Sequence, residues 1–563
     1  MERQRTTQVI WQKRVTRRDV VRGAGAAFGV AIVGGVFGCG GSEQKTAVPA
    51  SGASPTVPKA KRGGTLLLPQ NNQFRDLNPQ VGGGSNTSLF VHDRLGNYDQ
   101  VNGRYELSLA QSFENPDPLT YIWKIKPNAR FQNLPPVNGR NVTSGDVVAS
   151  WNANVANPRA TGQAIFTDFV DHYETPDPVT LVVKCKKPNA WMISPQGLAG
   201  PHPTVVVPKE LIDQNVLEKV SVGCGPYVLE SFDAASGISF KRRPDGWHEA
   251  DRPYVDRVAY QVITDSAARS AALKAKQIDQ LAARDKLEAD EFKGYGPDIV
   301  IDRALANPAH LTARADEQGL FRDVRVREAL YNALNIQELI DMVELGEAEW
   351  GAPVPPYLEE WQLPADEIKK AFPHDVAKAK QLLAAGGWDS NQEVEFKYPS
   401  SDKVALLAQL IQKQLADVGI KTKLVPQDAL TVWATQTWQK RDYQLTVTMA
   451  TWTGQCPDPW LLHFTTNDRG AGNQAHFSDP EIDKIVEAQE LEFDFEKQRQ
   501  LILDAQRLIF KKFVPIFVLY TPYQLTGRWA YFHPAAATTG YAGTYGHYGW
   551  VDIDHPGYPK DRK

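Results

Sequence analysis

The chain has 563 residues, of which 42% are hydrophobic and 23% charged, and its formal net charge is −4. This length predicts two to four domains, and the composition is that of a folded protein rather than a disordered chain or a membrane bundle. The slightly acidic charge gives a nucleic-acid-binding role no electrostatic support. Only four cysteines occur and none forms a CxxC pair, so a zinc cluster or a thioredoxin-type site is unsupported.

Residues 1–38 have the features of an export signal. They carry seven basic and two acidic side chains, and an apolar run over residues 24–38 ends at Cys39. The run is shorter than the roughly 20 residues of a membrane-spanning helix, and a basic stretch before a short apolar stretch is typical of a signal. Arg17-Arg18 resembles a twin-arginine motif, and residues 36–39 resemble a lipobox in which Cys39 is acylated. The alternative is a signal that stays uncleaved or is cut elsewhere.

Residues 39–62 are predicted to be a flexible tether. They are rich in Ser, Ala, Pro, Gly and Thr and have no apolar period. A tether behind a lipidated Cys39 would keep a folded body close to the membrane without embedding it. We therefore expect an exported lipoprotein, periplasmic or at the cell surface, that is attached to the membrane.

From residue 63 onward, predicted strands and helices interleave. Strands are predicted at 63–69, 120–127, 180–185, 420–425, 445–450 and 514–519, and helices at 144–155, 402–418 and 494–512. The clearest helix is 402–418, where apolar residues from Val404 to Val418 form one stripe and Gly419 follows as a stop. A Thr-Pro-Asp-Pro turn is predicted at 175–178. The succession of the helix over 402–418, Gly419 and the strand over 420–425 indicates an α/β layer.

Seven segments of this body carry recognisable motifs in a fixed order. They are GGTLLLP (63–69) with Leu77-Asn78-Pro79 after it, LSLAQSFENPDPLTYIWKIKPNARF (107–131), VTSGDVVASW (142–151), VGCGPYVLE (222–230), FRDVRVREALYNALNIQELI (321–340), HDVAKAKQLLAAGGW (374–388) and TWTGQCPDPW (451–460). Together they resemble the extracellular solute-binding proteins, family 5, of peptide, oligopeptide and nickel ABC importers. Singly, most of these motifs only set turns and fill cores.

The resemblance implies an α/β, two-lobed, periplasmic-binding-protein-like fold of type II, with an inserted third subdomain and a central ligand cleft. Lobe I is expected to combine three ranges, 63–95, 221–308 and 526–563. The inserted subdomain is expected at 96–220 and lobe II at 309–525. Closure of such lobes is a hinge motion that bound ligand favours.

Two loops are candidates for the ligand site, because ligands of α/β lobes sit beyond the carboxyl ends of strands. The first loop offers amide groups, and the second offers aromatic faces, an amide, a thiol and a carboxylate. The candidate residues are Asn71, Asn72 and Gln73 in the first loop and Trp452, Gln455, Cys456, Asp458 and Trp460 in the second. The alternative for the second loop is structural: Asp458 caps the next helix and Trp460 packs inside it.

One residue departs from the pattern of peptide-binding members of the family. They usually place an acidic residue after the "WxG" motif, where it pairs with the peptide's amino terminus, but Gln455 holds that position here. A neutral amide cannot supply a charge-assisted bond, which is about twice as strong as a neutral one. The resemblance still implies a peptide ligand and an ABC permease partner, whereas Gln455 favours a neutral or blocked ligand. An oligosaccharide or a metal chelate is the alternative.

The rival classes find little support in the sequence. No GxSxG, HExxH or SxxK motif occurs, so we expect no catalytic residues and no cofactor. The histidines at 533, 547 and 555 lack the spacing of metal ligands, so no metal site is predicted. The cysteines at 185, 224 and 456 permit at most one disulfide, with buried thiols as the alternative. A monomer without a nucleic-acid partner is expected.

Overall fold

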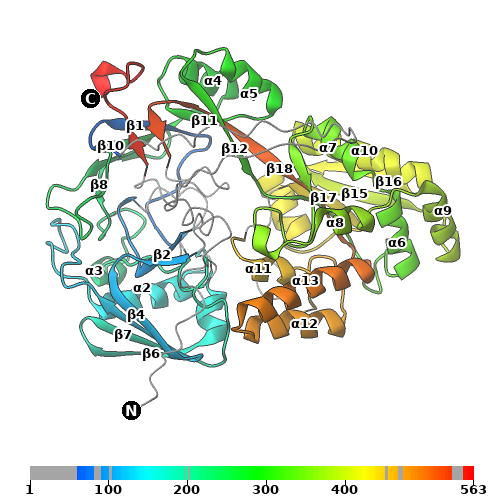
Figure 1. Cartoon of the computed structure of the whole chain (residues 1–563), viewed down its shortest axis with the longest axis horizontal. Coiled ribbons are helices and arrows are strands. Elements are labelled where there is room, and N and C mark those ends of the chain that lie inside the picture. Colours follow the sequence, from blue (N-terminus) through cyan, green and yellow to red (C-terminus); the bar gives the residue numbers. More distant parts are fainter. Residues whose placement is uncertain are drawn as a thin grey trace, which may run out of the picture.

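The computed structural model describes residues 60–81, 90–99, 104–160, 162–195, 197–200, 203–449, 454–466, 473–534 and 549–563. These residues form a mixed helix-and-sheet molecule with two lobes side by side (Figure 1). The predicted α/β, two-lobed architecture is therefore confirmed. Among the described residues, no helix combines the length and the apolar character that a membrane crossing needs.

The first lobe is built on a four-stranded sheet in which β1 is parallel to β10 and the other pairs are antiparallel. The strand order is β1 (Thr65–Gln70), β10 (Arg257–Val262), β9 (Gly237–Arg242) and β8 (Tyr227–Asp233). Two helices, α4 (Ser266–Lys274) and α5 (Lys286–Lys293), follow β10 along the chain. One apolar core joins the sheet, these helices and the chain's last strands.

A second, fully antiparallel sheet belongs to a subdomain inserted between β1 and β8. Its strand order is β4 (Ala110–Asp117), β5 (Thr120–Ile125), β7 (Thr180–Cys185) and β6 (Val170–Asp177). The hairpin β2 (Gly96–Asp99) and β3 (Arg104–Leu107) precedes it, and α2 (Ser144–Ala156), the π-helix η2 (Ile165–Phe169) and α3 (Lys209–Asp213) complete it. Thr143 caps the start of helix α2 in a capping box with Asp146. The subdomain has its own apolar core, in which Trp123 and Trp151 meet.

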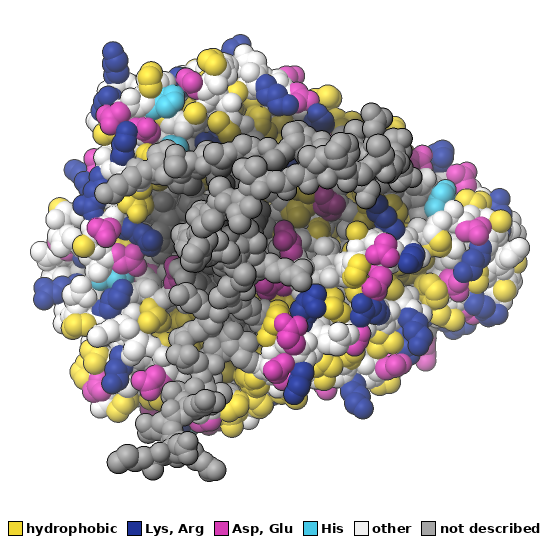
Figure 2. Space-filling view, viewed as in Figure 1, with side chains coloured by type: hydrophobic (Ala, Val, Ile, Leu, Met, Phe, Trp, Pro, Cys, Tyr) yellow, Lys and Arg dark blue, Asp and Glu magenta, His cyan; other side chains and the backbone are white. Residues whose placement is uncertain are grey.

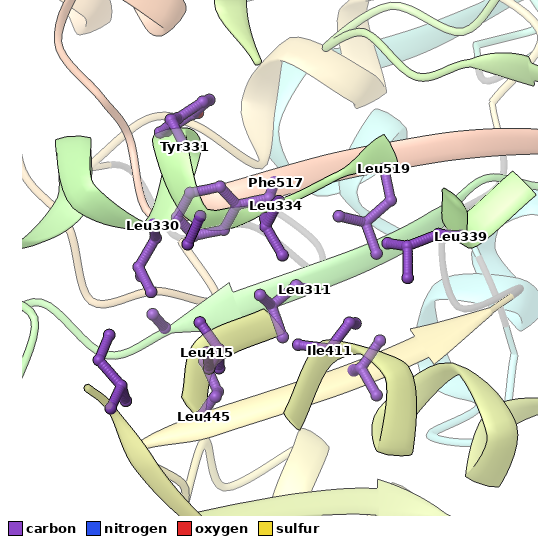
Figure 3. Packing of buried hydrophobic residues seen from close by; sticks show 14 of the residues in the cluster. Leu311, Leu330, Tyr331, Leu334, Leu339, Ile411, Leu415, Leu445, Phe517 and Leu519 are labelled. Atoms are coloured by element: carbon purple, nitrogen blue, oxygen red, sulfur yellow. The ribbon is translucent and has the colours of Figure 1, made fainter. Parts of the chain in front are cut away.

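The second lobe places helices around strands β13 (Ala309–Ala313), β17 (Leu445–Met449), β15 (Glu393–Pro399) and β16 (Lys421–Gln427). Its helices are α6 (Val324–Ala333), α7 (Ile336–Val343), η3 (Glu359–Trp361), α8 (Ala365–Ala371), α9 (Val376–Ala385), α10 (Asp402–Val418), η4 (Ala429–Trp438), α11 (Pro457–Leu462), α12 (Pro480–Leu491) and α13 (Phe495–Lys511). Figure 3 shows how Ile411 and Leu415 of α10 pack with Leu311 of β13 and Leu445 of β17. Such burial of apolar side chains is the main force that stabilises the lobe.

The long strand β18 (Ile516–Trp529) runs through both lobes (Figure 1). Its first residues pair with β13, its middle with β14 (Ala348–Trp350), and its last with β12 (Ile299–Leu305) and β11 (Gln280–Ala282). After β18 come β19 (Phe532–His533), β20 (Trp550–Val551) and η6 (Lys560–Arg562). The lobes are thus joined by a shared strand in addition to the β12–β13 connection.

Several sequence predictions can be compared directly with these elements. The helix over 402–418 is confirmed as α10, and Gly419 ends it with a positive φ of 97°. The helix over 494–512 is confirmed as α13 within one residue at each end. The strand over 514–519 is β18, which continues ten residues further because it pairs into the first lobe. The prediction of a turn at 175–178 is wrong, because β6 remains a paired strand through Asp177 and the chain turns only after that residue.

The three described cysteines, Cys185, Cys224 and Cys456, form no disulfide and all are buried. Burial raises the pKa of the Cys185 thiol to about 12, which keeps it protonated at neutral pH. These thiols therefore act as small apolar side chains in the cores.

Candidate functional site

A cavity of about 300 Å³ lies between the two lobes, beside β18. Its walls come from the start of α5, the β12–β13 connection, the turn after α7, the start of α10, the end of β17 with the residues after it, and the middle of β18. The lining residues are Ala283, Arg284, Asp285, Lys286, Ala306, Asn307, Val343, Glu344, Glu347, Tyr357, Lys403, Met449, Gly454, Gln455, Pro522, Tyr523, Gln524 and Leu525. The volume lies at the lower end of the roughly 300–1,000 Å³ of small-ligand sites.

Gln455 reaches this cavity because the backbone before it is held in place. The carbonyl of Gly454 accepts hydrogen bonds from the Tyr357 hydroxyl at 2.9 Å and from the Trp460 ring nitrogen at 3.0 Å. A side chain at Gly454 would meet that ring nitrogen at 2.7 Å, so the close approach requires glycine. Two aromatic donors on one carbonyl therefore position the neutral amide of Gln455 at the wall.

The charged side chains on the cavity wall are balanced, three cationic and three anionic. Five of them form ion pairs within the protein: Arg284–Glu288 at 3.1 Å, Lys286–Asp290 at 3.0 Å, Glu347–Arg303 at 2.8 Å and Glu344–Lys403 at 2.5 Å. The sixth, Asp285, caps α5 by accepting from the Glu288 backbone at 2.9 Å. Basic and acidic side chains are likewise intermixed over the face seen in Figure 2. Among the described residues, five of the six charged side chains on this wall are thus paired within the protein, and the sixth caps a helix.

The remaining predicted site residues lie elsewhere. Asn71, Asn72 and Gln73 follow β1 as predicted, but they are exposed and do not line the cavity. Trp452 lies outside the described residues. Cys456 and Trp460 are buried in the second lobe, Trp460 at 1% exposure, which is the packing alternative considered for Trp460.

Asp458 takes part in a contact between the inserted subdomain and the second lobe. Its Oδ1 accepts from the Gln489 amide at 2.7 Å, and Gln489 Oε1 accepts from the Trp191 ring at 2.7 Å. Trp191 comes from the inserted subdomain, yet it is 3% exposed inside the second-lobe core and lies edge-to-face against Trp361 at 5.4 Å. The backbone of Ala190 also donates to Glu490 at 2.7 Å. We call Asn189–Ser194 the docking segment.

Sequence reasoning missed Tyr357, Glu344, Lys403 and Trp191. None of them belongs to a motif that marks a site, and each meets its partner across more than 50 residues of chain. Trp191, between Asn-Ala and Met-Ile, was only a weak indication of a contact between the lobes, because tryptophan is more often a core residue of its own domain. Within the described parts of the chain, no group of three His, Cys, Asp or Glu side chains is arranged to hold a metal ion.

A two-lobed α/β body with a cavity where the lobes meet defines a ligand-binding receptor fold. Residues 104–473 match the family described as bacterial extracellular solute-binding proteins, family 5 (middle region). The chain belongs to this family.

Curated relatives agree with this membership. A putative ABC transporter peptide-binding protein of Brucella ovis is 28% identical over 359 residues, which is 61% of this chain and 65% of that protein. The match therefore spans slightly less than two thirds of that relative. The oligopeptide-binding protein AppA of Bacillus subtilis is 24% identical, over 80% of this chain and 84% of AppA.

Solved structures share the fold. The DppA protein of Helicobacter pylori, in complex with the peptide STSA, has a TM-score of 0.72 and 20% identity, over 87% of this chain and 98% of DppA. The periplasmic EDTA-binding protein EppA has a TM-score of 0.74 and 17% identity, over 88% of this chain and 97% of EppA. At these identities the likeness carries the fold and leaves the ligand open.

Proposed function

We propose that this chain is the substrate-binding lipoprotein of an ABC importer, which captures an extracellular peptide and delivers it to a membrane permease. Family membership supports the receptor role, and the names of the Brucella and Bacillus relatives support a peptide as the solute. The chain would act by binding and release and would not be an enzyme. The predicted ranges 63–95, 221–308 and 526–563 for lobe I, 96–220 for the inserted subdomain and 309–525 for lobe II are part of this proposal.

The observation that carries the proposal is the cavity between the lobes. A ligand held there touches the start of α5 on one side and the residues after β17 on the other, so it would stabilise the closed arrangement. With Gln455 on the wall and five of the six described wall charges paired within the protein, the site favours a peptide without a free ammonium group at this end. An N-acylated or otherwise blocked peptide is the ligand we propose.

Mass spectrometry of whatever co-purifies with the protein tests the solute first. Thermal-shift screening would follow, with tetrapeptides in free and N-acetylated form, oligosaccharides and metal salts. A ligand at 100 times its Kd adds about 2.7 kcal/mol of stability, and we expect this gain with peptides, in the acetylated form at least as much as in the free form. Stabilisation by oligosaccharides or metal salts alone would contradict a peptide ligand. Tight binding of free peptides that is lost on acetylation would contradict the neutral site.

The membrane attachment proposed for Cys39 has its own test. Cys39 and the twin-arginine-like residues lie outside the described residues, and the proposal rests on their sequence pattern. Changing Cys39 to Ser removes the thiol that would be acylated, so we expect the protein to leave the membrane fraction and to lose incorporation of labelled palmitate. Unchanged labelling of Cys39→Ser would show that the lipid is absent or attached elsewhere.

A further inference from the structure

The second-lobe side of the cavity contains a buried carboxylate. Glu344 directly follows α7, and its side chain is 3% exposed. Its Oε2 lies 2.5 Å from Nζ of Lys403, in the first turn of α10, and the Lys403 side chain is 33% exposed. Both residues line the cavity. The carboxylate is therefore deep in the wall, whereas the ammonium group that neutralises it can be reached from outside.

Glu344 is not fully satisfied by Lys403. Its Oε1 makes no hydrogen bond to Lys403 and instead lies near the buried hydroxyl of Tyr520, on β18, which interacts with the carboxylate. Burial raises the pKa of Glu344, and the charge of Lys403 opposes that rise. Burial and then the nearby Glu344 carboxylate raise the pKa of Tyr520 well above its usual range. A buried carboxylate attracts an ammonium ion strongly, because an unpaired buried charge is costly.

The ammonium group that this carboxylate attracts is supplied by the protein itself. Lys403 reaches Glu344 by a four-carbon stem from α10, so its charge is fixed at the wall and no ligand charge is needed there. A ligand with its own ammonium group would have to displace Lys403 or lie beside it. Either arrangement costs more than placing a neutral group at this end of the cavity.

We propose that Lys403 is a specificity-determining residue, which occupies the place of a ligand ammonium on Glu344 and restricts this end of the cavity to uncharged groups. The proposal rests on the proposed function, in that it assumes this cavity to be the ligand site. According to this proposal, removing Lys403 would leave Glu344 able to bind a primary ammonium group of the ligand, such as the amino terminus of a free peptide.

Chemical rescue of Lys403→Ala in the full chain tests the site without any knowledge of the natural ligand. The substitution removes the equivalent of n-propylammonium from Lys403. Adding n-propylammonium chloride should therefore raise the melting temperature of Lys403→Ala in a saturable way. Sodium chloride and tetramethylammonium chloride at equal ionic strength should not, since neither cation donates an N–H bond. Wild type and the double variant Glu344→Gln/Lys403→Ala are the matched controls and should show no rescue. Equal rescue of the double variant would overturn the proposal.

Tetra-alanine and N-acetyl-tetra-alanine then test specificity by calorimetry. Wild type should favour the acetylated form or bind both alike, whereas Lys403→Ala should favour the free form by about tenfold or more. Glu344→Gln, which leaves Lys403 uncompensated, should shift the ratio the opposite way. A ratio unchanged in both single variants would overturn the proposal. If neither peptide binds any variant, the peptide assignment fails, and the propylammonium experiment still decides the role of Lys403.

Discussion

Replacing Arg562 with methionine is expected to lower the free energy of unfolding of the first lobe by about 3–5 kcal/mol, the usual cost of removing one partner of a buried ion pair. The partner is Asp279, which is 0% exposed, and Nη1 of Arg562 lies 3.0 Å from both of its carboxylate oxygens. Methionine keeps most of the apolar stem, so the loss reports mainly the missing charge. Urea unfolding followed by circular dichroism would measure it.

The size of this effect follows from what Asp279 connects. Its oxygens also accept from the Leu67 backbone of β1 and from the Tyr531 hydroxyl, each at 2.7 Å. Burial raises the pKa of Asp279, and Arg562 opposes that rise. Without Arg562 the folded state binds a proton that the unfolded state has lost, so stability falls as pH rises above the usual aspartate pKa. The deficit of Arg562→Met should thus be larger at pH 8 than at pH 5.

A matched control for Arg562→Met is Arg325→Met. Arg325 pairs with Asp323 at 2.7 Å on the surface, with side chains 48% and 30% exposed. Exposed pairs contribute roughly 0–1 kcal/mol, so this variant should unfold almost like wild type. Equal losses in the two variants, or a loss in Arg562→Met that does not change with pH, would contradict the role given to Asp279.

Changing Trp191 to alanine is expected to weaken the contact between the inserted subdomain and the second lobe by about 3–5 kcal/mol, the usual cost of emptying a buried tryptophan site. The substitution removes the ring from the second-lobe core and leaves Gln489 without its ring N–H partner. The docking segment belongs to the inserted subdomain, and the core that buries Trp191 belongs to the second lobe. Losing this contact therefore favours an arrangement in which the two lobes are further apart. Small-angle X-ray scattering should show a larger radius of gyration.

Trp388→Ala is the control for the tryptophan experiment. Trp388 packs against Phe321 within the second lobe, so its removal should lower stability without changing the distance between the lobes. An unchanged radius of gyration for Trp191→Ala would show that the docking segment does not hold the lobes together. A larger radius for Trp388→Ala would show that any loss of second-lobe stability opens the molecule.

The fold could be predicted well where the signal is local. Helix α10 is recognisable from one apolar stripe and from Gly419, because both features act within a few residues. The full length of β18 could not be predicted, since its second half is a strand only by pairing with β11 and β12, more than 200 residues earlier in the chain. The two-lobed architecture was predicted from the resemblance of the motifs to a known family, because the hydrophobic periodicity of single segments does not indicate how lobes are arranged.

The candidate site was predictable only in part. Gln455 was singled out because it interrupts a recognised motif, and the structure places it on the wall of the cavity. Glu344 and Lys403 were not found, because a glutamate after one helix and a lysine at the start of another are ordinary surface choices until the fold buries one beside the other. Trp460 has the side-chain type that ligand sites use, but helix α11 turns it into the core.

The shared strand β18 also limits how this protein can change during evolution. Side chains alternate between the two faces of a strand, so inserting or deleting one residue reverses the facing of everything beyond it. In most proteins such a change harms one sheet. Here Phe517 and Leu519 belong to the core of one lobe, and Leu525 and Trp529 to the core of the other. Inserting or deleting one residue in β18 would therefore turn core residues of one lobe or the other toward the wrong face. The two lobes cannot change their lengths independently along this strand.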